Sequence, residues 1–182
     1  MVWHLLLGGC AFIAFLLFDA AKAKGRQHAK GWFLLGGLLL VSATILLLLP
    51  ALRAGIQAWR IPFGILAALT LFLYLYVLFG ALPAKKTYGD GNTKVVTTGV
   101  YALCRHPGGW CFLFLYWLLY LFCGGTGMLL GAILFPALNF LYIFVEDRYL
   151  FPQYIGGYEV YRREVPFLLP NGRSIRAFLK KP

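Results

Sequence analysis

Four long apolar runs occupy most of this chain of 182 residues. Three of them are Val2–Phe18, with 17 residues, Trp32–Leu49, with 18, and Ile61–Leu82, with 22. The fourth, Trp110–Val145, continues for 36 residues without a charged side chain. A membrane helix needs about 20 consecutive apolar residues, with a lower limit near 17. These lengths therefore predict an all-α integral membrane protein.

The fourth run is too long for one membrane span. As a single helix it would extend about 54 Å at 1.5 Å per residue, whereas the hydrocarbon core is about 30 Å thick. Gly124-Gly125-Thr126-Gly127 interrupts the run near its middle, and such glycines are typical of a turn. We therefore predict a C-terminal helical hairpin and five transmembrane helices. The half from Trp110 to Cys123 has only 14 residues, so either its helix begins before Trp110 or its turn lies below the far membrane surface.

The composition agrees with a membrane location. Apolar residues make up 61% and charged residues 13% of the chain, whereas soluble domains are nearer half apolar and a quarter charged. The net charge of +11 sits in short segments between apolar runs, so we expect membrane lipids and no nucleic acid as partners. We predict one membrane domain over residues 1–182, with three N-terminal spans in 1–82 and the remaining elements in 83–182.

The lysines and arginines predict the orientation of the chain. With five spans, the first connection, the third connection and the C-terminal tail share one side of the membrane. Basic residues on that side are Lys22, Lys24, Arg26, Lys30, Lys85, Lys86, Lys94, Arg105, Arg148, Arg162, Arg163, Arg173, Arg176, Lys180 and Lys181. Only Arg53 and Arg60 lie on the other side. The positive-inside rule then places the N-terminus outside and the C-terminus in the cytoplasm.

Two polar segments flank the predicted hairpin, Pro83–Pro107 and Glu146–Pro182. Because the hairpin returns the chain to its starting surface, we expect the two segments to meet at one membrane face and to build the functional site there. The first segment contains Gly89-Asp90-Gly91-Asn92, which is a turn signal. The cysteines and histidines have no spacing that completes a metal site, so we predict none.

The first segment ends in Arg105-His106-Pro107, immediately before an apolar helix. Proline suits the first turn of a helix. A cation and an imidazole at this position fit a ligand site, but an arginine that extends to the lipid headgroups and a histidine that caps the helix would fit it too. The residues alone leave both interpretations open.

The second segment begins with Glu146 and Asp147 at the membrane boundary, where acidic residues are costly unless they are paired or functional. Farther on, Tyr154, Tyr158, Tyr161 and Val165 have the spacing of one helix face. We predict a short cytoplasmic amphipathic helix over these residues. For Glu146 and Asp147 the alternative interpretation is a solvated helix end. For the tyrosine face it is a helix that lies on the bilayer.

Together the two segments resemble a known family. Gly99-Val100-Tyr101, followed after three residues by Arg105-His106-Pro107, resembles the GxYxxxRHP element of the isoprenylcysteine carboxyl methyltransferases and related membrane phospholipid methyltransferases. The second family element reads roughly EExxLxxxFGxxYxxYxxxVPxxxP. The residues in matching places are Glu146, Asp147, Leu150, Tyr154, Tyr158, Tyr161, Val165, Pro166 and Pro170. The resemblance covers roughly the last 85 residues, while the first three spans match only in hydropathy.

The resemblance implies S-adenosylmethionine as methyl donor and a lipophilic acceptor, either an isoprenylcysteine-type carboxylate or a phospholipid amine. It implies that the cofactor is bound by Tyr101, Arg105, His106, Pro107, Glu146, Tyr158 and Tyr161. We predict Glu146, Arg105 and Arg163 as catalytic residues. Arg162 or Arg163 would hold an acceptor carboxylate, whereas Glu146 or Asp147 would take the proton of an acceptor amine.

The chain departs from the family pattern at three places. Gly109 stands where the family has tyrosine, Asp147 where it has glutamate, and Ile155 where it has glycine. Membrane sterol and steroid reductases, which use NADPH, are an alternative with a similar C-terminal half, but they usually carry asparagine where Gly108 follows Pro107. A non-catalytic membrane scaffold or a transporter is the third interpretation.

Overall fold

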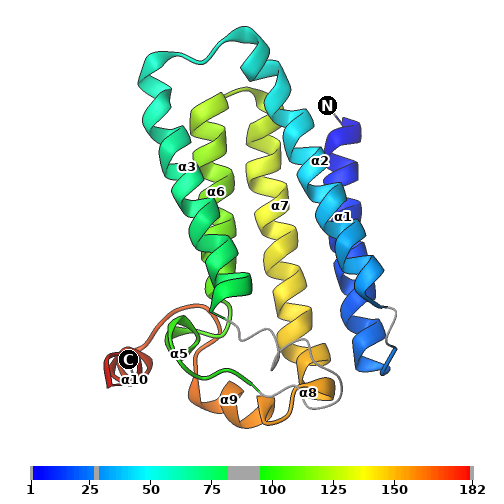
Figure 1. Ribbon diagram of the computed structural model, residues 1–182, viewed down its shortest axis with the longest axis vertical. Coiled ribbons are helices and arrows are strands. Elements are labelled where there is room, and N and C mark those ends of the chain that lie inside the picture. Colours follow the sequence, from blue (N-terminus) through cyan, green and yellow to red (C-terminus); the bar gives the residue numbers. More distant parts are fainter. Residues whose placement is uncertain (1, 27–28, 82–94, 181–182) are drawn as a thin grey trace.

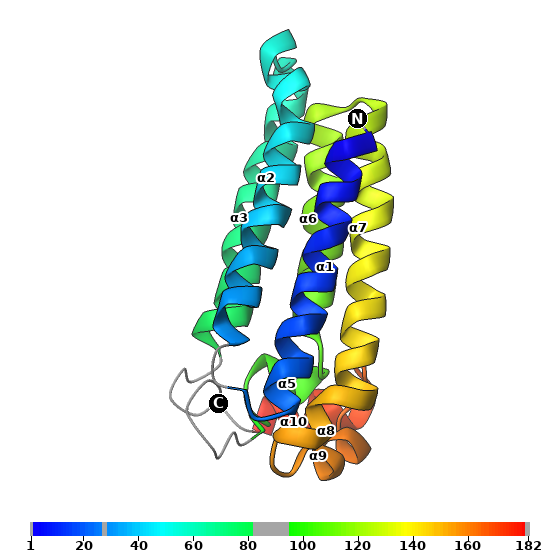
Figure 2. The same ribbon diagram turned by 90° about the vertical axis from the view of Figure 1, so that its right-hand side faces the viewer.

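The computed structural model describes residues 2–26, 29–81 and 95–180, and its regular elements are helices. Helices α1, α2, α3, α6 and α7 run side by side along the long axis of the molecule, and the short helices α5, α8, α9 and α10 gather at one end (Figures 1 and 2). The bounds are α1 Val2–Ala23, α2 Lys30–Ala54, α3 Ile61–Leu75, α5 Val100–Leu103, α6 Pro107–Cys123, α7 Thr126–Val145, α8 Phe151–Tyr154, α9 Tyr158–Glu164 and α10 Gly172–Lys180. Short 3-10 and π turns lengthen three of them: η2 Ala58–Arg60, η3 Tyr76–Gly80 and η4 Glu146–Leu150.

Four helical segments in the described part of the chain are long and apolar enough to cross a membrane: Val2–Ala23, Lys30–Ala54, Ala58–Gly80 and Thr126–Tyr154. Helix α6 is also apolar, but with 17 residues it is shorter than these four. The described residues therefore confirm an all-helical fold with several helices apolar enough to cross a membrane, whereas the count of five spans stays a prediction.

The longest apolar run is divided into two helices at Gly124 and Gly125. Helix α6 starts at Pro107, three residues before the apolar run, and Gly124 and Gly125 separate it from α7 with φ angles of 69° and 81°. Such positive φ angles suit glycine, because they bring a Cβ atom into contact with the backbone. The guanidinium of Arg60 closes the end of α6 by donating a hydrogen bond to the Cys123 carbonyl at 2.7 Å.

The core lies where α1, α2, α6 and α7 meet. Phe112, Met128 and Phe135 are almost fully buried there, and the ring of Tyr116 meets the ring of Phe135 edge-on at 5.4 Å. Small residues let the helices approach, because Gly8 on α1 sits directly over the Phe135 ring. Close approach over small residues is how helices gain packing energy in a membrane, where lipid is as apolar as the side chains.

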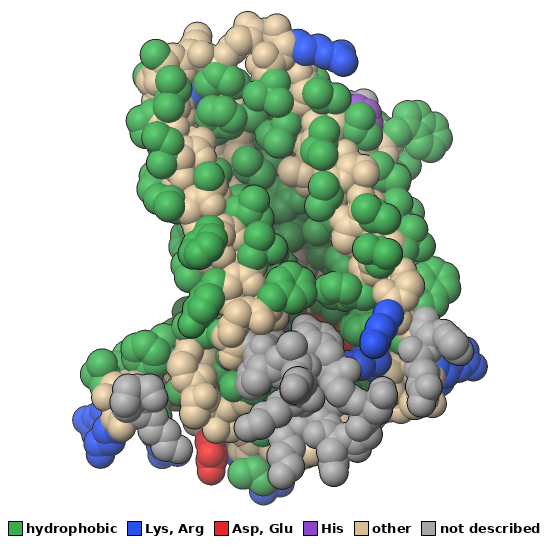
Figure 3. Space-filling model, viewed as in Figure 1, with side chains coloured by type: hydrophobic (Ala, Val, Ile, Leu, Met, Phe, Trp, Pro, Cys, Tyr) green, Lys and Arg blue, Asp and Glu red, His purple; other side chains and the backbone are tan. Residues whose placement is uncertain are grey.

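The outer surface of the bundle is apolar over most of its length (Figure 3). Large side chains such as Trp3, Leu34, Leu69 and Phe72 are more than 60% exposed. A soluble protein rarely leaves so large an apolar surface in water. Such a surface is suited to an apolar environment such as lipid.

The predicted amphipathic helix is divided in two. Helix α8 ends at Tyr154 because Ile155 is extended, and α9 begins at Tyr158 after Gly157, which adopts the left-handed conformation with φ 81°. The prediction of one continuous face was therefore wrong for Tyr154, which lies on α8, and for Val165, which is extended and follows the end of α9. Tyr158 and Tyr161 are both buried on α9. The Gly89–Asn92 turn and the basic residues Lys85, Lys86 and Lys94 lie outside the described residues.

The packing of α1 on α7 gives a test with two adjacent glycines. A Cβ atom at Gly8 would stand 2.2 Å from the Phe135 ring, whereas the nearest atom to a Cβ at Gly9 is 3.9 Å away. Phe135 is 0% exposed and cannot move aside. We expect Gly8→Ala to destabilise the bundle by about 1–3 kcal/mol through overpacking and Gly9→Ala to leave it unchanged or slightly more stable. Unfolding by SDS in mixed micelles measures both, and equal midpoints would contradict this packing.

Candidate functional site

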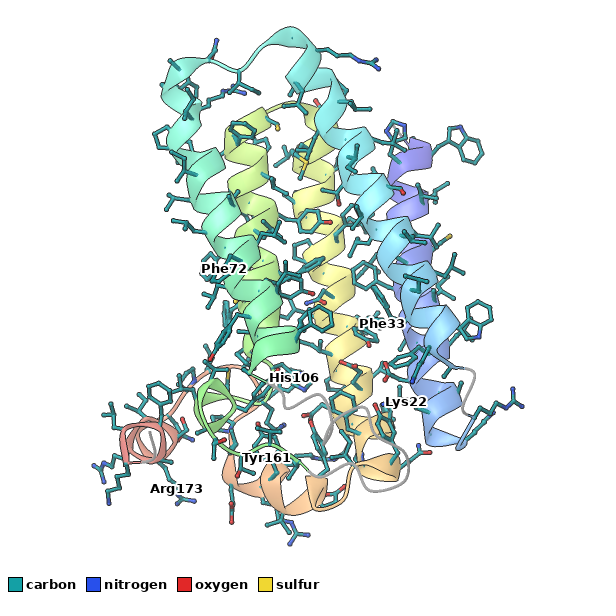
Figure 4. The ribbon with its side chains drawn as sticks, viewed as in Figure 1. Lys22, Phe33, Phe72, His106, Tyr161 and Arg173 are labelled. Atoms are coloured by element: carbon teal, nitrogen blue, oxygen red, sulfur yellow. The ribbon has the colours of Figure 1, made fainter. Side chains whose placement is uncertain are left out.

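A cavity of about 270 Å³ opens at the end of the bundle that carries the short helices. Its walls come from helices that are distant in sequence, including α1, α2, α3, α6, α7 and α9. Figure 4 shows Lys22, Phe33, His106 and Tyr161 gathered at this end, while Phe72 points outward from α3 and Arg173 lies away on α10. The cavity therefore lies where the polar segments meet the apolar bundle.

Seven of the eight predicted site residues line this cavity. They are Tyr101, Arg105, His106, Pro107, Glu146, Tyr158 and Tyr161. Arg163 is the exception: its side chain is exposed on α9 and is not part of the cavity wall. The expected meeting of the two polar segments at one place is confirmed, because Arg105 and Asp147 are in direct contact.

The guanidinium of Arg105 joins the two segments. Its Nε and Nη2 atoms donate to the two carboxylate oxygens of Asp147 at 2.6 and 2.9 Å. Its Nη1 atom donates to the carbonyl oxygens of Arg162, at 2.8 Å, and Val165. A guanidinium suits this position, because its planar fork matches a carboxylate and its remaining N–H groups can cap the carbonyls at the end of a helix. These bonds engage all three nitrogen atoms of the Arg105 guanidinium in contacts within the protein.

Backbone hydrogen bonds join the same two polar segments. The amides of Arg105 and His106 donate to the carbonyls of Pro166 and Phe167 at 2.9 and 3.3 Å. The indole of Trp110 donates to the Leu168 carbonyl at 2.9 Å. The segment after α9 therefore lies along the start of α6, and its carbonyl groups accept the hydrogen bonds.

Tyrosine hydroxyl groups hold the neighbouring part of the cavity wall in place through hydrogen bonds. Tyr161 donates to the Tyr101 carbonyl at 2.7 Å, and Tyr101 donates to the Val77 carbonyl at 2.9 Å. Tyr158 donates to Asp147 at 2.7 Å. Burial raises the pKa of both Tyr158 and Tyr161, so these phenols stay protonated donors at physiological pH.

The imidazole of His106 is almost completely enclosed. Its Nε2 atom lies 3.2 Å from Asp147, and its ring stacks on Phe151 and meets Phe167 edge-on. Burial lowers the pKa of His106 more than the nearby Asp147 raises it. The ring is therefore neutral at physiological pH, and Nε2–H donates to the Asp147 carboxylate.

Glu146 and Asp147 are adjacent but face different surroundings. Both are buried, yet Glu146 lines the cavity whereas Asp147 is held by Arg105, His106 and Tyr158 outside the cavity wall. They begin the π-helical turn η4. Turns of this kind are frequent at functional sites, because the extra residue changes which side chains face a pocket.

Sequence reasoning missed the contribution of the first helix. Asp19 on α1 is 2% exposed and lines the cavity with Lys22, one turn farther along. Tyr142 and Tyr154 donate to the two oxygens of Asp19 at 2.6 and 2.9 Å. The available signal was an acidic residue at the end of an apolar run, which is the same signal that drew attention to Glu146.

The cavity also extends sideways between two helices. Phe33 and Leu40 of α2 form one side of it, and Tyr74 and Phe79, from α3 and η3, form the other. Figure 3 shows the surface hollowed between these helices. The cavity therefore has an apolar side between α2 and α3.

Comparison of the chain with models of known protein families, with curated proteins and with solved structures finds no match in any of the three.

The buried Arg105–Asp147 pair gives a stability prediction. Asp147→Asn keeps the shape of the side chain but leaves the guanidinium buried without a counter-charge. Breaking a buried pair in this way costs about 3–5 kcal/mol. The matched control is Glu159→Gln, whose pair with Arg162 is 3.6 Å long and exposed, and such surface pairs contribute about 0–1 kcal/mol. Equal SDS unfolding midpoints for the two variants would contradict the structural role of Asp147.

His106 gives a pH prediction. Because its pKa in the folded protein lies below the ordinary value of 6.5, the unfolded chain binds the proton more tightly. The contribution of His106 to stability is therefore complete above that value and is lost as the pH falls below it. We expect the SDS unfolding midpoint of the wild type to fall more between about pH 7.5 and pH 5.5 than that of His106→Gln. Parallel pH profiles would show that His106 is not buried in its neutral form.

Proposed function

We propose that this protein is an integral membrane methyltransferase that uses S-adenosylmethionine and acts on a lipophilic acceptor. The observation that carries the proposal is that seven residues from two separate polar segments line one cavity of about 270 Å³. These segments are the two that resemble the isoprenylcysteine carboxyl methyltransferase elements. Their joining through Arg105 and Asp147 supports one shared ligand site.

The proposal includes five membrane spans, with α6 as the fourth and α7 as the fifth. The turn at Gly124 and Gly125 lies at the opposite end of the bundle from α9 (Figure 1). The excess of lysine and arginine on the connections around the cavity supports a cytoplasmic site and an external N-terminus. A water-soluble cofactor would then enter from the cytoplasm.

The groups in the cavity wall fit such a cofactor. Its sulfonium is a cation, which buried carboxyl groups and aromatic faces favour, and the wall contains Asp19, Glu146 and several phenylalanine and tyrosine rings. The aromatic rings also suit stacking of a flat adenine base. When bound, S-adenosylmethionine supplies an electrophilic methyl group.

The protein groups then act mainly by positioning. Methyl transfer is an in-line displacement, so holding donor and acceptor in line supplies much of the rate. Arg105 and Asp147 fix the wall, Tyr158 and Tyr161 hold α9 against it, and Glu146 is the charged group that the wall presents. The lateral opening between α2 and α3 brings a lipid-soluble acceptor to this wall.

Glu146 provides the main functional test. Glu146→Gln keeps the size of the side chain and removes its charge, so we expect at least a hundredfold loss of methyl transfer with little change in unfolding midpoint. The assay incubates native membranes with S-adenosylmethionine carrying a tritiated methyl group and counts tritium in the extracted lipids. The control is Glu164→Gln, an exposed residue on α9.

The outcomes separate the alternatives. Full transfer by Glu146→Gln would show that the site is misplaced. A specific ligand stabilises the folded protein by mass action, so S-adenosylhomocysteine should raise the melting temperature of the purified protein and NADPH should not. Stabilisation by NADPH alone would favour a reductase, and stabilisation by neither would favour a non-catalytic protein.

A further inference from the structure

Helix α10, Gly172–Lys180, lies beside the cavity end of the bundle, and none of its residues lines the cavity. Asn171 caps its start: the side-chain oxygen of Asn171 accepts hydrogen bonds from the amides of Arg173 and Ser174 at 3.1 and 2.9 Å. The Ser174 hydroxyl accepts in return from the Asn171 amide at 2.9 Å. Reciprocal bonds of this kind fix where a helix starts, so the chain forms a defined helix here.

The side chains of α10 divide into two faces. Basic residues recur on one side of the helix and large apolar residues on the opposite side, as the period of 3.6 residues per turn requires. The basic face consists of Arg173, Arg176 and Lys180, and the apolar face of Ile175, Phe178 and Leu179. The helix contains no acidic residue. It therefore carries three positive charges directly opposite an apolar surface.

Both faces lack partners within the described part of the chain. The apolar side chains are between 36% and 74% exposed. The ion pairs among the described residues involve Arg105, His106 and Arg162, and none involves the basic face. Helix α10 packs on α5, and Ser174 is its buried residue. A helix of nine residues is shorter than the about 12–15 at which isolated helices become stable in water, so a surface that accepts its two faces would support it.

Helix α10 lies across the bundle. Figure 1 shows it nearly end-on, whereas the long helices run along the vertical axis, and Figure 2 shows it crosswise at the same end. Apolar side chains gather on the side of α10 toward the bundle and basic side chains on the side away from it (Figure 3), where Arg173 lies in Figure 4. A bundle that crosses a membrane along its long axis therefore places α10 parallel to the membrane surface, with its apolar face toward the hydrocarbon.

We propose that α10 is an interfacial helix that binds the headgroups of anionic phospholipids. Its apolar face inserts among acyl chains beside the bundle, and its basic face holds the phosphate groups around them. Basic residues opposite an apolar face are typical of helices that lie on negatively charged membranes. Two of the three cations are arginines, whose planar fork matches the geometry of a phosphate. The proposal concerns lipid binding and does not depend on methyl transfer.

Two contacts connect this helix to the cavity wall. Helix α5, on which α10 packs, contains Tyr101 of the wall. The segment before α10 accepts hydrogen bonds from Arg105 and His106 through the Pro166 and Phe167 carbonyls. Lipid bound at α10 therefore holds this side of the wall at the membrane surface. Anionic lipids are concentrated in the cytoplasmic leaflet, on the side that the lysines and arginines predict for this end of the bundle.

The test compares two phospholipids that have the same dioleoyl chains and differ in headgroup charge. The full-length protein is placed in nanodiscs of phosphatidylcholine with or without phosphatidylglycerol, and amide hydrogen exchange is followed by mass spectrometry. We expect the α10 amides to exchange about tenfold more slowly with phosphatidylglycerol, because each basic residue beside an anionic surface contributes about fivefold in affinity. Exchange in α1 should not change. Equal α10 exchange in the two lipids would overturn the proposal.

Charge variants assign the effect to the basic face. The first variant replaces all three residues of the basic face with glutamine, and the slowing by phosphatidylglycerol should disappear in it. The matched control removes the same charge from exposed residues outside α10, with the substitutions Lys24→Gln, Arg53→Gln and Arg148→Gln. The control should keep the slowing. The same response in both variants would show that α10 is not the lipid site.

A second pair of variants tests the apolar face. Leu179 is 74% exposed on α10, and Val160 is 60% exposed on α9, so neither substitution disturbs a core. Leu179→Ser should speed the exchange of α10 in both kinds of nanodisc, because it removes apolar surface from the hydrocarbon. Val160→Ser should leave α10 exchange unchanged. Equal α10 exchange in the two variants would show that the apolar face lies in water.

Two further measurements exclude other occupants of α10. In an uncharged detergent at constant ionic strength, added phosphatidylglycerol should slow α10 exchange and inorganic phosphate should not. Equal slowing by phosphate would make this a site for a free anion. The nanodiscs are sorted by mass into those with one and those with two copies of the protein. Slowing that appears only with two copies would make the partner a second chain, and either result would overturn the lipid proposal.

Discussion

The buried ion pair between Arg105 and Asp147 is the interaction on which the polar end of the molecule depends. It joins the start of α6 to the end of α7, and the same guanidinium caps the last carbonyls of α9. Each of these groups would be costly to bury alone at the edge of a membrane. Because these charged groups and carbonyls pair with one another, three segments that are not adjacent in sequence form one wall.

That wall differs from the opposite side of the cavity. The wall of α6, α7 and α9 is held by hydrogen bonds from tyrosines, a histidine and an arginine. The side formed by α2 and α3 contributes apolar side chains such as Phe33, Leu40 and Phe79. Directional bonds suit the part of a site that must orient reacting atoms, whereas apolar contacts suit a tail whose position need not be fixed.

The sequence was sufficient for the features that depend on local pattern. Apolar run length predicted the long helices, and the order of the two polar segments predicted that they meet, which the contact of Arg105 with Asp147 confirms. Asp19 escaped notice because its partners lie 123 and 135 residues away, so no local pattern joins them. Helical spacing also failed at Tyr154, since the extended backbone at Ile155 and the left-handed Gly157 outweigh the periodicity around them. Arg163 was selected from its charge, but its position on α9 turns it to the exposed side.

Glu146 and Asp147 show how neighbouring acids come to serve different purposes. Asp147 is balanced by an arginine, a histidine and a tyrosine, so its charge is satisfied within the protein. Glu146 instead lines the cavity, as Asp19 and Lys22 of α1 also do. An acid buried at the edge of apolar helices is costly, and acidic side chains that line a cavity are characteristic of functional sites. Because Glu146 faces the cavity and Asp147 does not, ligand chemistry is expected at the first acid and structural support at the second.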